Sequence, residues 1–83
     1  MDATIPLEVH HGQNSMAVVA RLPGVRLQDL HVAITRKLLT IDAETPEGSR
    51  HGSLALASPV DDGRAIMRFR DGILWMHLPK LPT

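Results

Sequence analysis

Apolar residues recur at every second position along most of this 83-residue chain. Ile5, Leu7 and Val9 alternate with Pro, Glu and His, and the same period returns after each cluster of Gly, Pro, Asn or Asp. A period of two is typical of β-strands, because successive side chains point to opposite faces of a sheet. No stretch has the length and period of an amphipathic helix. The pattern predicts strands near residues 5–9, 16–22, 30–35, 39–43, 51–56, 64–70 and 73–78.

Turn signals separate these segments. Leu22-Pro23-Gly24-Val25 places Pro second and Gly third, as a type II turn with a positive φ at Gly24 requires. Asp71-Gly72 is a two-residue hairpin signal. Residues 44–50 are expected to form a short polar loop. Strands at intervals of about ten residues predict an all-β fold, an antiparallel, immunoglobulin-like β-sandwich, with one domain over residues 1–83.

Composition and charge narrow the function classes. The chain has no cysteine, which excludes disulfides, thiolate metal sites and thiol catalysis. Nine basic residues balance nine acidic ones, and Phe69 and Trp75 are the only large aromatic side chains, so nucleic-acid binding is not expected. Neither a signal peptide nor an apolar run long enough for a membrane span is visible. We expect a cytoplasmic protein that binds no nucleic acid and no membrane.

The polar side chains that could carry chemistry are scattered. His10 and His11 are adjacent in a strand and point to opposite faces, and the other histidines lie on separate segments, so no metal site is predicted. Asp61-Asp62 precedes Gly63 and fits turn chemistry better than a pair of catalytic carboxylates. The sequence holds no glycine-rich phosphate loop and no nucleophile elbow. It predicts no catalytic residue, no cofactor and no enzymatic activity.

Several short motifs occur in a definite order along the chain. They are Leu22-Pro23-Gly24-Val25, Gln28-Asp29-Leu30, Leu39-Thr40-Ile41 seven residues after Val32, Val60-Asp61 seven residues before Met67, Asp71-Gly72-Ile73-Leu74, and Leu78-Pro79-Lys80. This ordered set resembles the α-crystallin domain of small heat-shock proteins, and the resemblance covers most of residues 5–80.

The chain departs from the family pattern elsewhere. Ala43 stands where the family often has Gly, and Leu56-Ala57 stands where it has Leu-Pro. We expect neither the N-terminal arm nor the C-terminal tail motif of the family. The segment between the Ile41 and His51 strands is also too short for the swapped loop of bacterial and plant members. The resemblance therefore implies a core domain rather than a subunit of a large assembly.

The resemblance implies a stress-response chaperone: an ATP-independent holdase whose partners are unfolding client proteins with exposed apolar segments. In the family, a groove between two strands receives apolar residues. The alternative is a docking domain of the same fold, such as a CS-type co-chaperone or a domain attached to a larger ATPase, because isolated cores are weak holdases. Carried onto this chain, the groove walls are Leu30, Val32 and Ile34 on one side and Ala65, Met67 and Phe69 on the other, about half of them core.

The alternation also predicts an outer patch on the sheet that holds the last strand. If Leu74 and Met76 point inward, Trp75 points outward, and the strand order of the family places Val19 and Ile66 beside it. Arginine stems with cation–π support then cover this outer patch, or it packs against an arm or a partner.

A homodimer is expected through an edge strand. The strand through His51 and Leu54 has an outer edge that we expect to be unpaired, and an unpaired edge is a template for a second copy. Gly52 and Ser53 have low strand propensity and Arg50 is charged, so the predicted dimer is weak.

Overall fold

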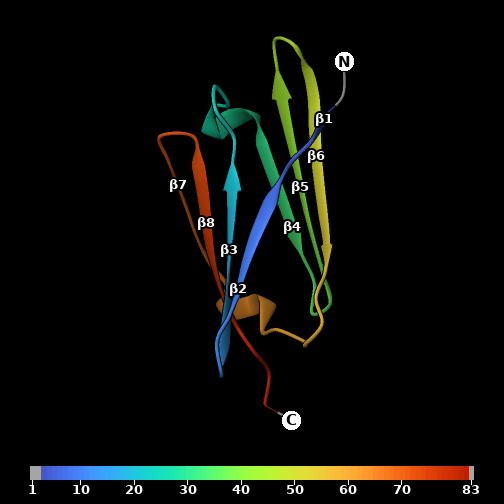
Figure 1. Ribbon diagram of the computed structural model, residues 1–83, viewed down its shortest axis with the longest axis vertical. Coiled ribbons are helices and arrows are strands. Elements are labelled where there is room, and N and C mark those ends of the chain that lie inside the picture. The colour runs from blue at the N-terminus through green and yellow to red at the C-terminus, as the bar shows by residue number, and fades with distance from the viewer. Residues whose placement is uncertain (1–2, 83) are drawn as a thin grey trace.

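The chain folds into two packed four-stranded sheets in the computed structural model, which describes residues 3–82. Two short 3-10 turns, η1 (Leu27–Asp29) and η2 (Asp62–Arg64), connect strands, and the described residues contain no α-helix. The predicted all-β sandwich is confirmed (Figure 1). Sheet A has the order β1-β6-β5-β4, with β1 (Ala3–Thr4), β4 (Leu30–Ile34), β5 (Leu38–Thr45) and β6 (Gly48–Ala55). Sheet B has the order β2-β3-β8-β7, with β2 (Leu7–His11), β3 (Ser15–Arg21), β7 (Ile66–Arg70) and β8 (Ile73–Pro79).

The core lies between the sheets and follows the predicted alternation. Its side chains are apolar throughout, and no polar side chain of the described residues is buried. Removing this apolar surface from water is the main force that holds the two sheets together. The central strands supply most of it: Met16, Val18 and Ala20 from β3, Leu39, Ile41 and Ala43 from β5, and Leu74, Met76 and Leu78 from β8.

Both predicted turns are confirmed. Gly24 has a φ of 79°, and the Val25 N–H donates to the Leu22 carbonyl at 3.2 Å, which closes the turn after β3. Asp71 and Gly72 have φ values of 53° and 76°, so both central residues of the β7–β8 hairpin are left-handed, as a type I′ turn requires. These turns therefore help to fix the register of the strands next to them.

The prediction of one strand over residues 5–9 is wrong in one respect, because the chain passes from one sheet to the other within that range. Ala3 and Thr4 pair in parallel with Arg50 and His51 of β6, whereas β2 pairs with β3 in sheet B. Ile5 lies at the crossing, where its N–H donates to the His51 carbonyl at 2.9 Å and its side chain is buried. Pro6 follows and has no N–H to continue either ladder, which explains why the strand divides there.

The polar loop predicted for residues 44–50 is also wrong. β5 and β6 continue as a paired hairpin up to Thr45 and Gly48. The Thr45 hydroxyl donates to the Gly48 carbonyl at 2.7 Å, and the Ser49 hydroxyl donates to the Glu44 carboxylate at 2.9 Å. Polar side chains here form a solvated end of the sheet, which lacks the apolar half of the alternation that marks a strand in sequence.

The outer edge of β6 is not free along its whole length, contrary to expectation. Ala3 and Thr4 cover it at Arg50 and His51, and the backbone of Ile5 adds one more bond. Within the described residues, positions 52–55 of β6 have no strand on that edge. The edge that we expected to pair with a second copy is therefore shorter than predicted.

Candidate functional site

One side of the sandwich holds an apolar groove between the edge strand β4 of sheet A and the edge strand β7 of sheet B. Its volume is about 240 Å³. All of its lining residues are apolar, and we call this hollow the β4–β7 groove. They are Leu27, Leu30, Val32, Met67, Phe69 and Leu74.

Local structure aims each of these side chains into the groove. Leu30 and Val32 are alternate residues of β4, and Met67 and Phe69 are alternate residues of β7, so each pair lies on the inward face of its strand. The buried Leu74, which lies opposite Phe69 in the ladder, belongs to the floor.

The η1 turn brings a further side chain to the end of the groove. The Leu30 N–H donates to the Leu27 carbonyl, and the Arg26 guanidinium donates to the Asp29 carboxylate at 3.1 Å across the same turn. These contacts hold Leu27 at the groove with 69% of its surface exposed. An apolar side chain this exposed has area left to bury against a ligand.

The structure brings Leu30, Val32, Met67 and Phe69 together, as the sequence predicts, but not the whole predicted set. Ile34 and Ala65 do not line the groove and pack against the core as half-buried residues. Ala65 is not part of the strand predicted over residues 64–70, because Arg64 belongs to η2 and β7 begins at Ile66.

Leu27 and Leu74 were missed by the sequence analysis. The alternation of the last strand does mark Leu74 as inward, although it does not say that the residue reaches the groove. No periodic signal marks Leu27, because it belongs to a turn between strands.

The groove offers apolar contact and strand edges and no reactive chemistry. None of its lining side chains can titrate or donate a hydrogen bond. β4 and β7 each lack a strand partner on one edge within the described residues, so their free backbone groups face the groove side of the sandwich. Such a site suits an extended segment that adds main-chain hydrogen bonds while placing alternate apolar side chains into the hollow.

The predicted outer patch of Val19, Ile66 and Trp75 lies on the solvent face of sheet B. Val19 is directly opposite Trp75, while Ile66 is opposite His77. The Trp75 indole stacks on the His77 ring, with centroids 6.1 Å apart and an interplanar angle of 18°. This aromatic contact along β8 was not anticipated, since the sequence analysis considered arginine stems as the cover of the indole.

The charged side chains that pair within residues 3–82 do so on the surface of the domain. The shortest joins Asp42 Oδ1 and His51 Nδ1 at 2.6 Å, and both side chains are more than half exposed. Within residues 3–82, no three His, Cys, Asp or Glu side chains are arranged to hold a metal ion. In the same part of the chain, no helix is long and apolar enough to cross a membrane.

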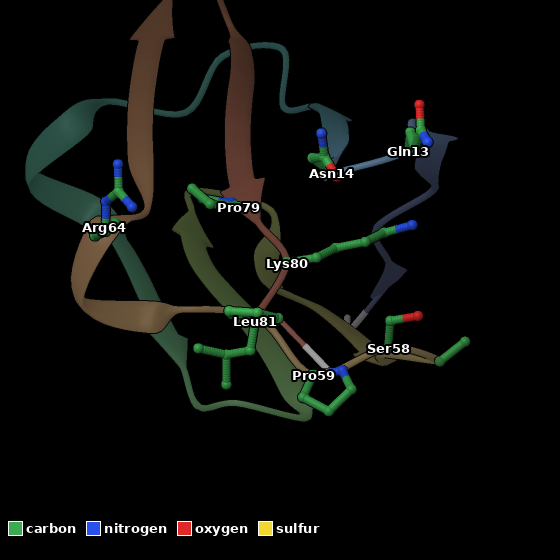
Figure 2. A pocket seen from close by; sticks show the side chains of 10 residues that line it. Gln13, Asn14, Ser58, Pro59, Arg64, Pro79, Lys80 and Leu81 are labelled. Atoms are coloured by element: carbon green, nitrogen blue, oxygen red, sulfur yellow. The ribbon is translucent and has the colours of Figure 1, made fainter.

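A larger hollow of about 700 Å³ lies at the end of the sandwich where the chain leaves β8 (Figure 2). Its lining includes two cations, Arg64 and Lys80. The Lys80 ammonium donates to the Gly12 carbonyl at 2.8 Å, and Figure 2 shows its side chain directed away from Arg64. Because the two cations do not converge, this open hollow lacks the charge arrangement of an anion site.

Comparison with known proteins relates the chain to heat-shock proteins, although no protein-family model matches it. Heat shock protein 16 of Schizosaccharomyces pombe is 29% identical over 93 residues, which cover 90% of this chain and 65% of that protein. The 18 kDa antigen 1 of Mycobacterium avium is 26% identical over 91 residues, which cover 93% of this chain and 62% of that protein. The chain thus spans less than two thirds of the length of these relatives.

Solved structures share the fold. Heat shock protein 16.0 from Schizosaccharomyces pombe superposes with a TM-score of 0.88 at 24% identity, over 96% of this chain and 68% of that chain. A small heat-shock protein from Xylella fastidiosa gives a TM-score of 0.81 at 22% identity, over 95% of this chain and 87% of that chain. The chain therefore has the α-crystallin β-sandwich fold of these solved structures, and its sequence is similar to the heat-shock relatives over most of its length.

Proposed function

We propose that this domain is the core of an ATP-independent holdase that binds exposed apolar segments of unfolding proteins in the β4–β7 groove. The observation that carries the proposal is the groove itself, apolar on every side and flanked by two strand edges. Holding a client in this way needs no catalytic residue and no cofactor. The relatives named as heat-shock proteins support the same conclusion at the level of the family.

Met67 is the groove residue best placed to adapt to different clients. Its side chain is 47% exposed, and a thioether on an unbranched stem repacks around different shapes at little cost. A client side chain that covers it gains about 25 cal/mol for each Å² of apolar surface removed from water. A small groove of this kind gives weak binding with little sequence preference, which suits a holdase.

A client-aggregation assay tests the proposal. We expect excess domain to reduce the light scattering of a thermally stressed client, equally with and without ATP. Met67→Asp should abolish the effect, because a carboxylate in the groove would lose its hydration when an apolar segment binds. Leu38→Asp is the matched control. Leu38 has an exposed fraction of 43%, similar to the 47% of Met67, but it lies outside the groove.

Equal protection by Met67→Asp and by the unchanged domain would contradict a role for the groove. Failure of the unchanged domain to protect any client would contradict the holdase. If an apolar peptide still bound the groove in that case, the docking-domain alternative would take its place.

We also propose that copies of the domain pair weakly through positions 52–55 of β6. The proposal is supported by the edge that β1 leaves uncovered there. Light scattering across a concentration series should show a monomer–dimer equilibrium that shifts to monomer on dilution. A mass independent of concentration would contradict it.

A further inference from the structure

The two outer faces of the sandwich carry opposite charge. On sheet B, Arg21 of β3 and Arg68 and Arg70 of β7 share the outward face, and Glu8 of β2 is the only acidic residue among the outward strand residues there. On sheet A, the outward strand residues include the acids Asp42 and Glu44 of β5 and no Lys or Arg. The basic face also holds large exposed apolar side chains, whereas sheet A presents mainly His, Ser, Thr and Ala.

Strand register arranges the basic face in rows. Arg68, Trp75 and Val19 lie directly opposite one another across β7, β8 and β3. Arg70, Ile73 and Arg21 form the next outward row across the same strands. Each row therefore has an apolar centre on β8 and an arginine on β7, and we call these two rows the Arg-Trp face.

Nearby carboxylates neutralise the arginines of this face only weakly. The Arg68 guanidinium makes no hydrogen bond or ion pair with another side chain of residues 3–82. Arg70 lies 3.7 Å from Asp71, but both side chains are about nine-tenths exposed, so that pair contributes little. Arg21 lies 3.4 Å from Glu8, again at an exposed position. Trp75 stacks on His77, and 38% of the residue remains exposed.

We propose that the Arg-Trp face binds a segment of a partner protein in which acidic and apolar residues alternate. Its carboxylates would pair with Arg68 and Arg70, while its apolar side chains cover Trp75 and Ile73. Bidentate pairing suits guanidinium groups, and the register spaces these arginines two residues apart on one strand. This site is separate from the β4–β7 groove, because Ile66, Arg68 and Arg70 point to the opposite side of β7 from Met67 and Phe69.

A second copy of the chain is a poorer occupant. The same face of another molecule would set arginine against arginine, which repels. The acidic face of sheet A has carboxylates, but Asp42 already contacts His51 and Glu44 already accepts from Ser49. Leu38 is the large exposed apolar residue on the outward strand positions of sheet A, so that face offers little apolar surface to cover an indole. The charges therefore favour a different protein with an acidic segment.

Trp75 is the only tryptophan and reports directly on this site. The probe is a tryptophan-free peptide of ten residues in which Glu and Leu alternate, and its control is the same peptide with Lys in place of Glu. We expect the Glu peptide to shift Trp75 emission to shorter wavelength and to protect it from acrylamide quenching. Raising the salt concentration should weaken this binding, because the arginines are exposed.

Substitutions can test binding at the Arg-Trp face independently of binding in the β4–β7 groove. Arg68→Gln with Arg70→Gln should weaken binding of the Glu peptide about tenfold, the loss expected for two exposed ion pairs. Arg36→Gln with Lys37→Gln removes the same charge at the β4–β5 turn and should leave binding unchanged. Met67→Asp should lose client protection and keep peptide binding, so the two proposals fail separately.

Three results would overturn the proposal. One is a Glu peptide that leaves Trp75 quenching unchanged, and another is equal binding of the Lys peptide. The third is Trp75 protection that rises with protein concentration in the absence of peptide and disappears in Asp42→Asn with Glu44→Gln. That result would assign the face to a second copy.

Discussion

The two long sides of the sandwich differ in what closes them. On the side of β6 and β2, the chain itself crosses from sheet A to sheet B, and Ile5 fills the gap between them with only 3% of its surface exposed. A hollow of about 100 Å³ remains there. On the side of β4 and β7, the connection from β3 to β4 brings η1 only to the end of the groove, and the hollow of about 240 Å³ stays open.

On the proposed function, the difference explains how this fold would form a binding site from apolar side chains and strand edges alone. Every two-sheet sandwich has two such sides, and each exposes the apolar margin of the core unless something covers it. Here Ile5, a residue of the same chain, covers one side. The proposed client segment covers the other in the same way, with apolar side chains between the sheets and backbone bonds to an edge strand.

The largest expected effect comes from opening the closed side. Ile5→Ala should lower the free energy of unfolding by about 2–4 kcal/mol, because it leaves a cavity between the sheets. Urea unfolding measures the loss. If the variant does not fold, Ile5→Val should still cost about 1 kcal/mol. A change near zero for both variants would mean that Ile5 does not close that side.

A smaller loss of stability is expected from adding a side-chain atom next to Ile5, where the chain crosses between the sheets. A Cβ on Gly52 would lie 3.1 Å from the Ile5 Cβ and 3.4 Å from the Ile5 carbonyl oxygen. Ile5 is fixed by its bond to His51, so Gly52→Ala should destabilise the domain by about 1–2 kcal/mol. Ser53→Ala, one residue further along β6, is the control and should change the unfolding midpoint little. Stabilisation by Gly52→Ala would show that Ile5 can shift to accept the added Cβ at little cost.

The turn that leads from β3 toward the open side provides the next prediction. No atom outside the turn lies within 4 Å of a Cβ at Gly24, so the cost of Gly24→Ala is conformational alone. With φ at 79°, we expect a loss of about 1 kcal/mol in the free energy of unfolding. Thermal melting followed by circular dichroism checks this value, and a neutral substitution would contradict the turn assignment.

The smallest expected effect on stability is at the open side. Met67→Ala should change the free energy of unfolding by no more than about 0.5 kcal/mol, because the side chain is nearly half exposed and fills no closed space. A loss comparable to that of Ile5→Ala would mean that the two sides do not differ. Retained stability combined with weaker client protection would sharpen the contrast between them.

The fold could be predicted because most strands bury one face, and burial leaves a two-residue period in the sequence. The errors occur where that period carries no information. Residues 44–45 and 48–50 belong to strands with little apolar alternation, and Ala3–Thr4 is too short to show any period. Ile5, Leu7 and Val9 keep the same period although Ile5 closes the space between sheets and β2 belongs to sheet B.

The groove could be predicted only in part for a related reason. Alternation marks Leu30, Val32, Ile34, Met67 and Phe69 as inward, yet it does not say how far along a strand the two sheets stay apart. Ile34 lies where the core already covers it, and Leu27 reaches the groove from a turn. Both facts depend on tertiary packing, which local sequence does not encode.

Amide chemical shifts of the ¹⁵N-labelled domain, followed during titration with a short uncharged peptide of alternating Ile and Thr, would locate the bound segment. We expect the perturbations to concentrate on β4, β7 and the residues of η1, and Met67→Asp to remove them. Amides beside Ile5 on β6 should stay unchanged. Perturbations centred on β1 and β6, or a pattern unaltered by Met67→Asp, would contradict the claim that the open side is the binding site.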